Sequence, residues 1–148
     1  MAITQAIANS FKKQLLEADH NFASAGGDTF KIALYTSSAT LNSATTVYAN
    51  TNEVSNTGQY VTGGGALVNA GTSITAGVAR CDFNDRSFTG VTLTARGALI
   101  YNTSAAVSNS AVAVLDFGSD KTATSGTFTI QSSAQLAPDR RASCRERV

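Results

Sequence analysis

The sequence predicts a mainly β, single-domain fold: an antiparallel sandwich or barrel of about 7–8 short strands, preceded by an N-terminal amphipathic α-helix. Three observations lead to this prediction. Apolar residues recur every four positions at the start of the chain, and from residue 28 onward they alternate with polar residues. Short apolar stretches are separated by turn-forming Gly, Asn, Asp and Ser. The chain has 148 residues, 43% of them hydrophobic, and is long enough to bury one substantial core.

The N-terminal helix is expected over residues 3–18, inside a first segment that spans residues 1–25. Its apolar face is formed by Ile3, Ile7, Phe11 and Leu15, with Ala8 and Leu16 at its margins. Gly26 and Gly27 follow as a stop signal. Two alternatives are open for the apolar face: it packs on its own domain, or it is an arm that contacts a neighbouring subunit.

Residues 28–131 are expected to form the β-domain. The expected strands, in order, are TFKIALYT, ALVNAG, GVARCDF, GVTLTA, RGALIYN, AVAVLDF and GTFTIQ. Residues 37–65 lie between the first two and are rich in turn formers, so they are expected to form long surface loops holding one or two short strands. GALIYN and AVAVLDF are apolar on both faces, which predicts central strands.

The residues that usually carry chemistry are scarce. The single histidine, His20, follows the expected helix and is interpreted as a solvated helix-end residue. Alternation places Cys81 on the apolar face of a strand and its charged neighbours, Arg80 and Asp82, on the other face. This favours a small buried side chain over a nucleophile. We therefore expect no catalytic residue, no cofactor and no metal site, and the chain is not expected to be an enzyme.

Several short motifs match functional patterns by letters only. GGG at 63–65 is not followed by the Lys and helix of a phosphate-binding loop, and DFG at 116–118 lacks every other element of a kinase. DFNDRS at 82–87 lacks the EF-hand glycine and glutamate and is interpreted as a hairpin turn. The tyrosines lie in different strands and loops without basic neighbours, so they do not predict a nucleic-acid stacking surface; they are Tyr35, Tyr48, Tyr60 and Tyr101.

The charge balance argues against nucleic-acid and membrane partners. The formal net charge is +1, from 11 basic and 10 acidic residues. Residues 139–148 hold four Arg, one Asp and one Glu, so the remainder has seven basic and eight acidic groups, a net charge of −1. There is no apolar run of the roughly 20 residues that cross a bilayer, and the N-terminus lacks the order of a secretory signal. Synthesis in a bacterial cytoplasm is the expectation.

Five segments in this order resemble a family of small structural proteins of tailed bacteriophages. The resemblance covers residues 1–131 and rests on MAITQAIANSFKKQLLE, DTFKIALYTSSATL, TARGALIYN, AVAVLDFGSDKT and GTFTIQ. It implies a virion protein present in many copies, a homo-oligomer whose partners are capsid or tail subunits and itself. It also implies an apolar, strand-like segment after FTIQ, from which SSAQLAPDRRASCRERV departs.

Two roles within that family are considered, and a third role of a different class. The favoured one is capsid decoration, or another accessory head role, on a repeating lattice. The alternative is a tail tube or tail-associated subunit, although the helix between strands and the long stacking loop usual in tube subunits are not evident. A second alternative is a receptor- or glycan-binding module, which the absence of Trp disfavours.

The last residues differ in composition from the rest. We expect 132–138 to be a frayed end, and we interpret 139–148, DRRASCRERV, as non-native. The codons GAT CGG AGA GCG TCG TGT AGG GAA AGA GTG encode these ten residues and match a common sequencing adapter with one base lost. The hypothesis is that a translated adapter replaces the natural end, so neither the arginines nor Cys144 enters the functional argument.

Overall fold

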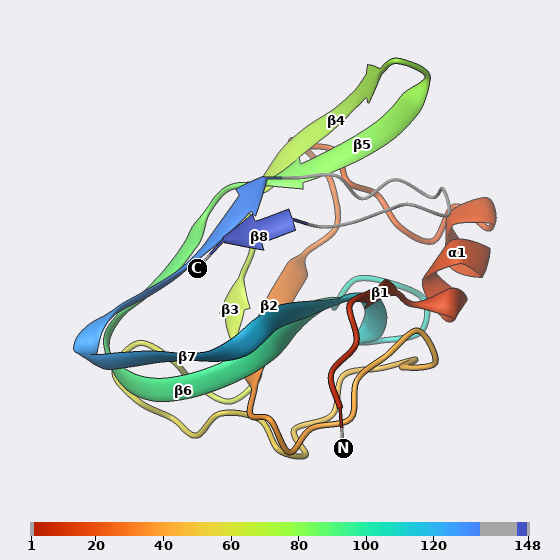
Figure 1. The fold of residues 1–148 in the computed structure, drawn as a ribbon. Coiled ribbons are helices and arrows are strands. Elements are labelled where there is room, and N and C mark those ends of the chain that lie inside the picture. The colour runs from red at the N-terminus through yellow and green to blue at the C-terminus, as the bar shows by residue number, and fades with distance from the viewer. Residues whose placement is uncertain (1, 134–144, 148) are drawn as a thin grey trace.

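The fold is taken from a computed structural model that describes residues 2–133 and 145–147 (Figure 1). In chain order the elements are β1 (Ala6–Ile7), α1 (Asn9–Leu16), β2 (Phe30–Tyr35), β3 (Gly65–Ala66), β4 (Asn69–Thr75), β5 (Val78–Phe83), β6 (Arg86–Asn102), β7 (Ser110–Ser133) and β8 (Arg145–Arg147). One short helix therefore accompanies a set of strands, and the predicted mainly β character is confirmed.

The main sheet has the strand order β1-β7-β6-β2-β3, and all of its pairings are antiparallel. β8 pairs with the end of β7 off this path. β4 and β5 form a separate two-stranded sheet. No pairing between the described strands closes the main sheet, so the prediction of a possible barrel was wrong. The architecture is an open antiparallel sheet with a two-stranded ribbon beside it.

β6 and β7 are much longer than the short strands expected from the sequence. GVTLTA and RGALIYN both lie in β6, while AVAVLDF and GTFTIQ both lie in β7. The glycines interpreted as turns instead accompany β-bulges: residues 117–120 of β7 lie between the pairs Ala95–Lys121 and Gly97–Asp116, opposite Arg96 alone. A bulge bends a strand without ending its pairing, so β6 and β7 continue together around a corner (Figure 1).

The hydrophobic core is centred on β2, β6 and β7. GALIYN and the AVAVL part of AVAVLDF are buried, as expected for central strands, and Cys81 is buried as predicted. Aromatic rings fill one end of the core. Phe22 stacks on Phe30 with ring centroids 4.5 Å apart, and Phe83 meets Phe30 edge-on at 5.4 Å.

The N-terminal segment is less helical than the sequence predicts. α1 is eight residues long, so the expectation of a helix over 3–18 was wrong. Ile3 instead forms a parallel bridge with Leu41, and Ile7 lies in β1, opposite Ala113 of β7. The four-residue spacing of these apolar side chains is compatible with a helix. In the structure the backbone at these positions is extended instead, and its bridges to Leu41 and to β7 place the same side chains in the core.

β4 and β5 form a hairpin that projects from the body of the molecule (Figure 1). Its two-residue turn, Ala76 and Gly77, has φ angles of 51° and 77°, as a type I′ turn requires. The predicted hairpin turn in DFNDRS was wrong, because among the described strands β5 pairs only with β4. Asn84 and Asp85 instead carry the chain from the ribbon into the main sheet.

Residues 36–64 form a long connection between β2 and β3. The one or two short strands expected there are reduced to isolated bridges, such as that between Tyr35 and Glu53. Near the other end of the chain, β7 continues to Ser133, and β8 pairs with its last three residues. Of the expected frayed end, 132–138, only 132–133 are described, and they belong to β7. Of residues 139–148 only 145–147 are described, and they form β8.

Candidate functional site

The four residues predicted as possible intersubunit contacts lie against their own chain. Ile3, Ile7 and Phe11 are buried in the core, and Leu15 is partly buried against it. This is the first of the two alternatives open for the apolar face. A contact between subunits through these same side chains stays a prediction, and it would require them to leave the core.

The exposed apolar side chains of this region are different ones. Leu16, at the end of α1, is 91% exposed, and Val107, in the β6–β7 connection, is 54% exposed. Between α1 and that connection lies a pocket of about 370 Å³, lined by Ser10, Lys13, Gln14, Glu17, Asp19, Ala106 and Val107. The sequence pattern placed Leu16 at the margin of the expected apolar face, but in the structure this side chain is exposed.

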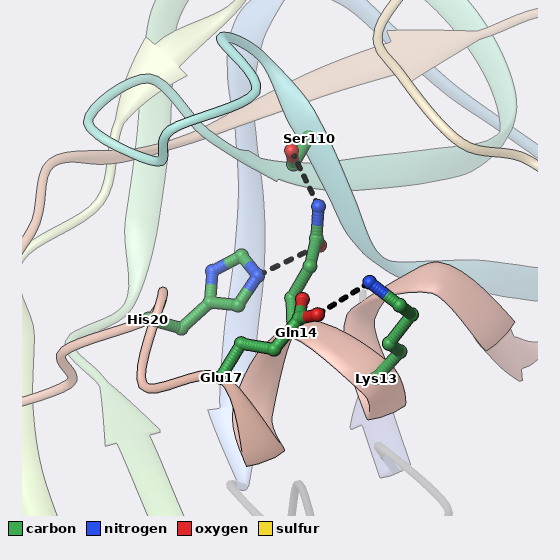
Figure 2. A network of polar contacts seen from close by, with 5 residues as sticks. All are labelled: Lys13, Gln14, Glu17, His20 and Ser110. Atoms are coloured by element: carbon green, nitrogen blue, oxygen red, sulfur yellow. Dashed lines mark hydrogen bonds and ion pairs between the residues drawn. The ribbon is translucent and has the colours of Figure 1, made fainter.

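A chain of polar contacts connects α1 to the main sheet (Figure 2). The Gln14 amide donates to the Ser110 hydroxyl at 3.1 Å, and its carbonyl lies 3.0 Å from Nε2 of His20. On the outer side of the helix, Lys13 pairs with Glu17. Gln14 and Ser110 are both buried, so the network replaces the water that these groups would otherwise bind.

The network assigns the tautomer of His20. Nδ1 lies 2.9 Å from the Asn102 amide nitrogen, which also donates to Asp28 at 2.8 Å. Since that nitrogen is only a donor, Nδ1 must accept, and the ring proton resides on Nε2 and is donated to Gln14. His20 is thus half-buried and hydrogen-bonded on both nitrogens, and its interpretation as a solvated residue was wrong.

The electrostatic balance at His20 favours the neutral ring. Burial lowers the pKa of His20 below its usual 6.5, and the nearby carboxylates of Asp19 and Asp28 oppose this shift only in part. The ring also packs against Phe11, with centroids 4.8 Å apart. His20 therefore attaches the residues that follow α1 to the sheet as an uncharged group.

The four tyrosines converge in the fold around one carboxylate, although they are distant in sequence. Glu53 accepts hydrogen bonds from the hydroxyls of Tyr48 at 2.6 Å and Tyr60 at 2.7 Å, and from the backbone N–H of Gly63 at 2.7 Å. Tyr101 donates to the Gly63 carbonyl at 2.6 Å and stacks on Tyr48 with centroids 4.6 Å apart. This tyrosine–Glu53 cluster holds residues 36–64 against the sheet.

The phenols of the cluster are held in their neutral form. Burial and the charge of Glu53 raise the pKa of Tyr101 to about 12 and raise the pKa of Tyr48 and Tyr60 further. The same causes raise the pKa of Tyr35, whose hydroxyl donates to the Ala49 carbonyl at 2.7 Å. No local pattern in the sequence signals this cluster, because its members lie on different segments and meet only through the tertiary fold.

The remaining motifs have structural positions. Gly63 and Gly64 of GGG have positive φ and lead into β3. Asp116 of DFG lies inside β7 at the bulge, where it pairs with Arg96 at 3.2 Å and accepts from the Gly118 N–H at 2.9 Å. Among the described residues there is no group of three or more His, Cys, Asp or Glu that could hold a metal ion. In the same part of the chain, no helix is long and apolar enough to span a membrane.

Comparison with known proteins yields no relative. No protein-family model, no curated protein and no solved structure matches the chain.

Proposed function

We propose that this protein is a non-enzymatic structural component of a tailed-bacteriophage virion, acting as a decoration or other accessory protein of the head. In this role many copies bind a repeating lattice of capsid subunits and brace their junctions. The protein is synthesised in the bacterial cytoplasm and functions in the assembled particle.

One observation carries the proposal. The separate segments on which the resemblance to phage structural proteins rests are the segments that pair to build the main sheet. TFKIALYT supplies β2, ALIYN the end of β6 and AVAVLDF the start of β7, and these three strands are neighbours. The segments that resemble the phage family are therefore packed together in one core. This supports a fold shared with that family more strongly than matches in five segments without mutual contact would.

The surface around α1 offers a means of attachment. Leu16 is almost fully exposed and Val107 is half-exposed, on elements that border the pocket between α1 and the β6–β7 connection. Lys13 and Glu17 line the pocket and contribute one positive and one negative charge. An apolar contact with a mixed-charge rim is the usual composition of a protein–protein interface.

Localisation in the particle tests the proposal. In an averaged image of the virion, density that fits this fold should lie on the capsid surface at the repeat of the lattice. Density confined to the tail would replace the head role with the tail-associated role. Specific binding on a glycan array, without ordered density on the capsid, would support a receptor-binding module instead.

A pair of variants tests the attachment surface. Leu16→Asp should reduce binding to particles that lack the protein, because a carboxylate would be desolvated at the contact. Val61→Asp is the matched control, since Val61 is also an exposed aliphatic residue, at 55%, but lies in the 36–64 connection. Equal binding by both variants and the parent would show that α1 does not attach the protein.

A further inference from the structure

The β4–β5 hairpin carries an apolar face that extends out of the core into solvent. Alternation places Ala79, Cys81 and Phe83 of β5 on one face, and pairing adds Thr72 and Ile74 of β4 to it. Phe83 and Cys81 are buried at the base, whereas Ile74 near the tip is 77% exposed. The face is thus continuous with the core but uncovered toward the tip.

The outer edge of β4 pairs with no strand that the structure describes. An outer strand edge presents backbone N–H and C=O groups that can pair with another strand, and a two-stranded ribbon without further support is only marginally stable in water. Native proteins usually protect such edges with Lys, other charges, Pro or bulges. From Asn69 to Ala79 the sequence NAGTSITAGVA has no charged residue and no proline, and the one irregularity of the ladder is at its base, between Asn69 and Gly71.

We propose that the outer edge of β4 pairs antiparallel with β4 of a second copy of this chain, so that two ribbons form one four-stranded sheet. The self-complementary sequence of β4 favours a second copy over another partner. Antiparallel pairing centred on Ser73 places Thr72 opposite Ile74 of the second copy and Ser73 opposite itself. β-Branched residues then meet on the apolar face, and no like charges oppose each other.

β5 is less suited to the same pairing. Its outer edge carries Arg80 and Asp82 close to the body of the molecule. At the base of β4, by contrast, Asn69 donates to the carbonyls of Ala23 and Asp28, which fixes the direction in which the ribbon projects. A ribbon held at its base and free at Thr72–Thr75 presents its edge in a defined orientation.

This pairing concerns copies of the chain with each other, so it goes beyond attachment to a capsid and can fail independently of it. Sedimentation velocity on the full chain, over a range of concentrations, should show a monomer–dimer equilibrium. Ile74→Lys should raise the dimer dissociation constant by about tenfold or more, since it places two ammonium groups at the joined edge. Val61→Lys is the matched control and should leave the constant unchanged, because Val61 is also an exposed β-branched residue but lies in the 36–64 connection.

Cross-linking tests the register. Ser73→Cys should form a disulfide-linked dimer on mild oxidation, because directly opposed residues of antiparallel strands have Cβ atoms about 4.5–5.5 Å apart. Thr94→Cys, exposed on β6, should not. A parent chain that stays monomeric at high concentration would overturn the proposal. So would a dimer that is insensitive to Ile74→Lys, or one that is not cross-linked through position 73. Binding of the monomer to a capsid or tail subunit through Ile74 would assign the edge to that partner instead.

Discussion

At the scale of single residues, the polar groups expected to contribute most to stability are buried groups with several hydrogen-bond partners. The Tyr60 hydroxyl lies 2.8 Å from the Leu34 backbone N–H, which donates to it, and it donates in turn to Glu53. Tyr60 is fully buried, so water cannot replace these bonds. Its loss would leave a backbone donor of β2 without a partner.

Tyr60→Phe should therefore lower the free energy of unfolding by about 1–3 kcal/mol, measured by chemical denaturation. Tyr35→Phe is the matched control, because it also removes one hydroxyl but frees only the carbonyl of the exposed Ala49. We expect it to lower the free energy by no more than about 1 kcal/mol. Equal effects of the two variants would mean that the Tyr60 hydroxyl has no special role.

His20 predicts how stability depends on mild acid. Its pKa is lower in the folded chain than the 6.5 of the unfolded chain, so the unfolded chain binds the proton more tightly. The contribution of the neutral ring is fully present above about pH 6.5 and is lost as the pH falls from there toward the folded-state pKa. Between pH 7 and 5 the unfolding free energy of His20→Gln should fall less than that of the parent. An identical slope in both proteins would contradict the assignment.

At the scale of elements, two glycines with nearly the same φ angle separate conformational strain from steric crowding. Gly64 has φ of 75° and Gly77 has φ of 77°. A Cβ on Gly77 would meet nothing within 4 Å, whereas one on Gly64 would lie 1.8 Å from the Ile32 carbonyl oxygen. Gly77→Ala should lower the unfolding free energy by about 1–2 kcal/mol. Gly64→Ala should add a further loss of about 1–3 kcal/mol by crowding β2, as denaturation curves would show.

The N-terminal segment is an element of the core in this fold. Deleting residues 1–20 removes Ile3, Ile7 and Phe11, each contributing about 1.5–3 kcal/mol by burial, against a typical domain stability of about 5–15 kcal/mol. We expect the truncated chain to lose its cooperative thermal transition in circular dichroism. Leu16→Ala, on the exposed side of α1, should keep it. A folded truncated chain would instead show that the segment is a detachable arm.

The sequence predicts some elements well and others poorly, for physical reasons. β2 and the buried halves of β6 and β7 were predictable, because alternation and continuous apolar runs are local properties. Gly90 and Gly118 mark turns by composition, but whether the chain turns or bulges depends on the partner strand. The tyrosine–Glu53 cluster and the His20 network depend wholly on contacts between distant segments, so no pattern along the chain announces them.

At the scale of the whole molecule, the core that the structure describes ends at Ile130. β8 adds three residue pairs beyond it, at the end of β7. Deleting residues 139–148 should therefore shift the melting temperature by no more than a few degrees, as calorimetry would show. A large loss of stability would contradict the interpretation of these residues as a non-native tail. It would show that β8 contributes to the stability of the fold.

The pairing of β1 with β7 also determines the order in which the chain assembles. β6 and β7 are joined by a short connection, so their ribbon forms from neighbouring residues, whereas Ala6 must meet Val114. Closing so long a loop is entropically unfavourable until the partner strand already exists. During synthesis on a ribosome, β1 is thus made well before the strand with which it pairs. Until then Ile7 remains accessible to chaperones and to other nascent copies.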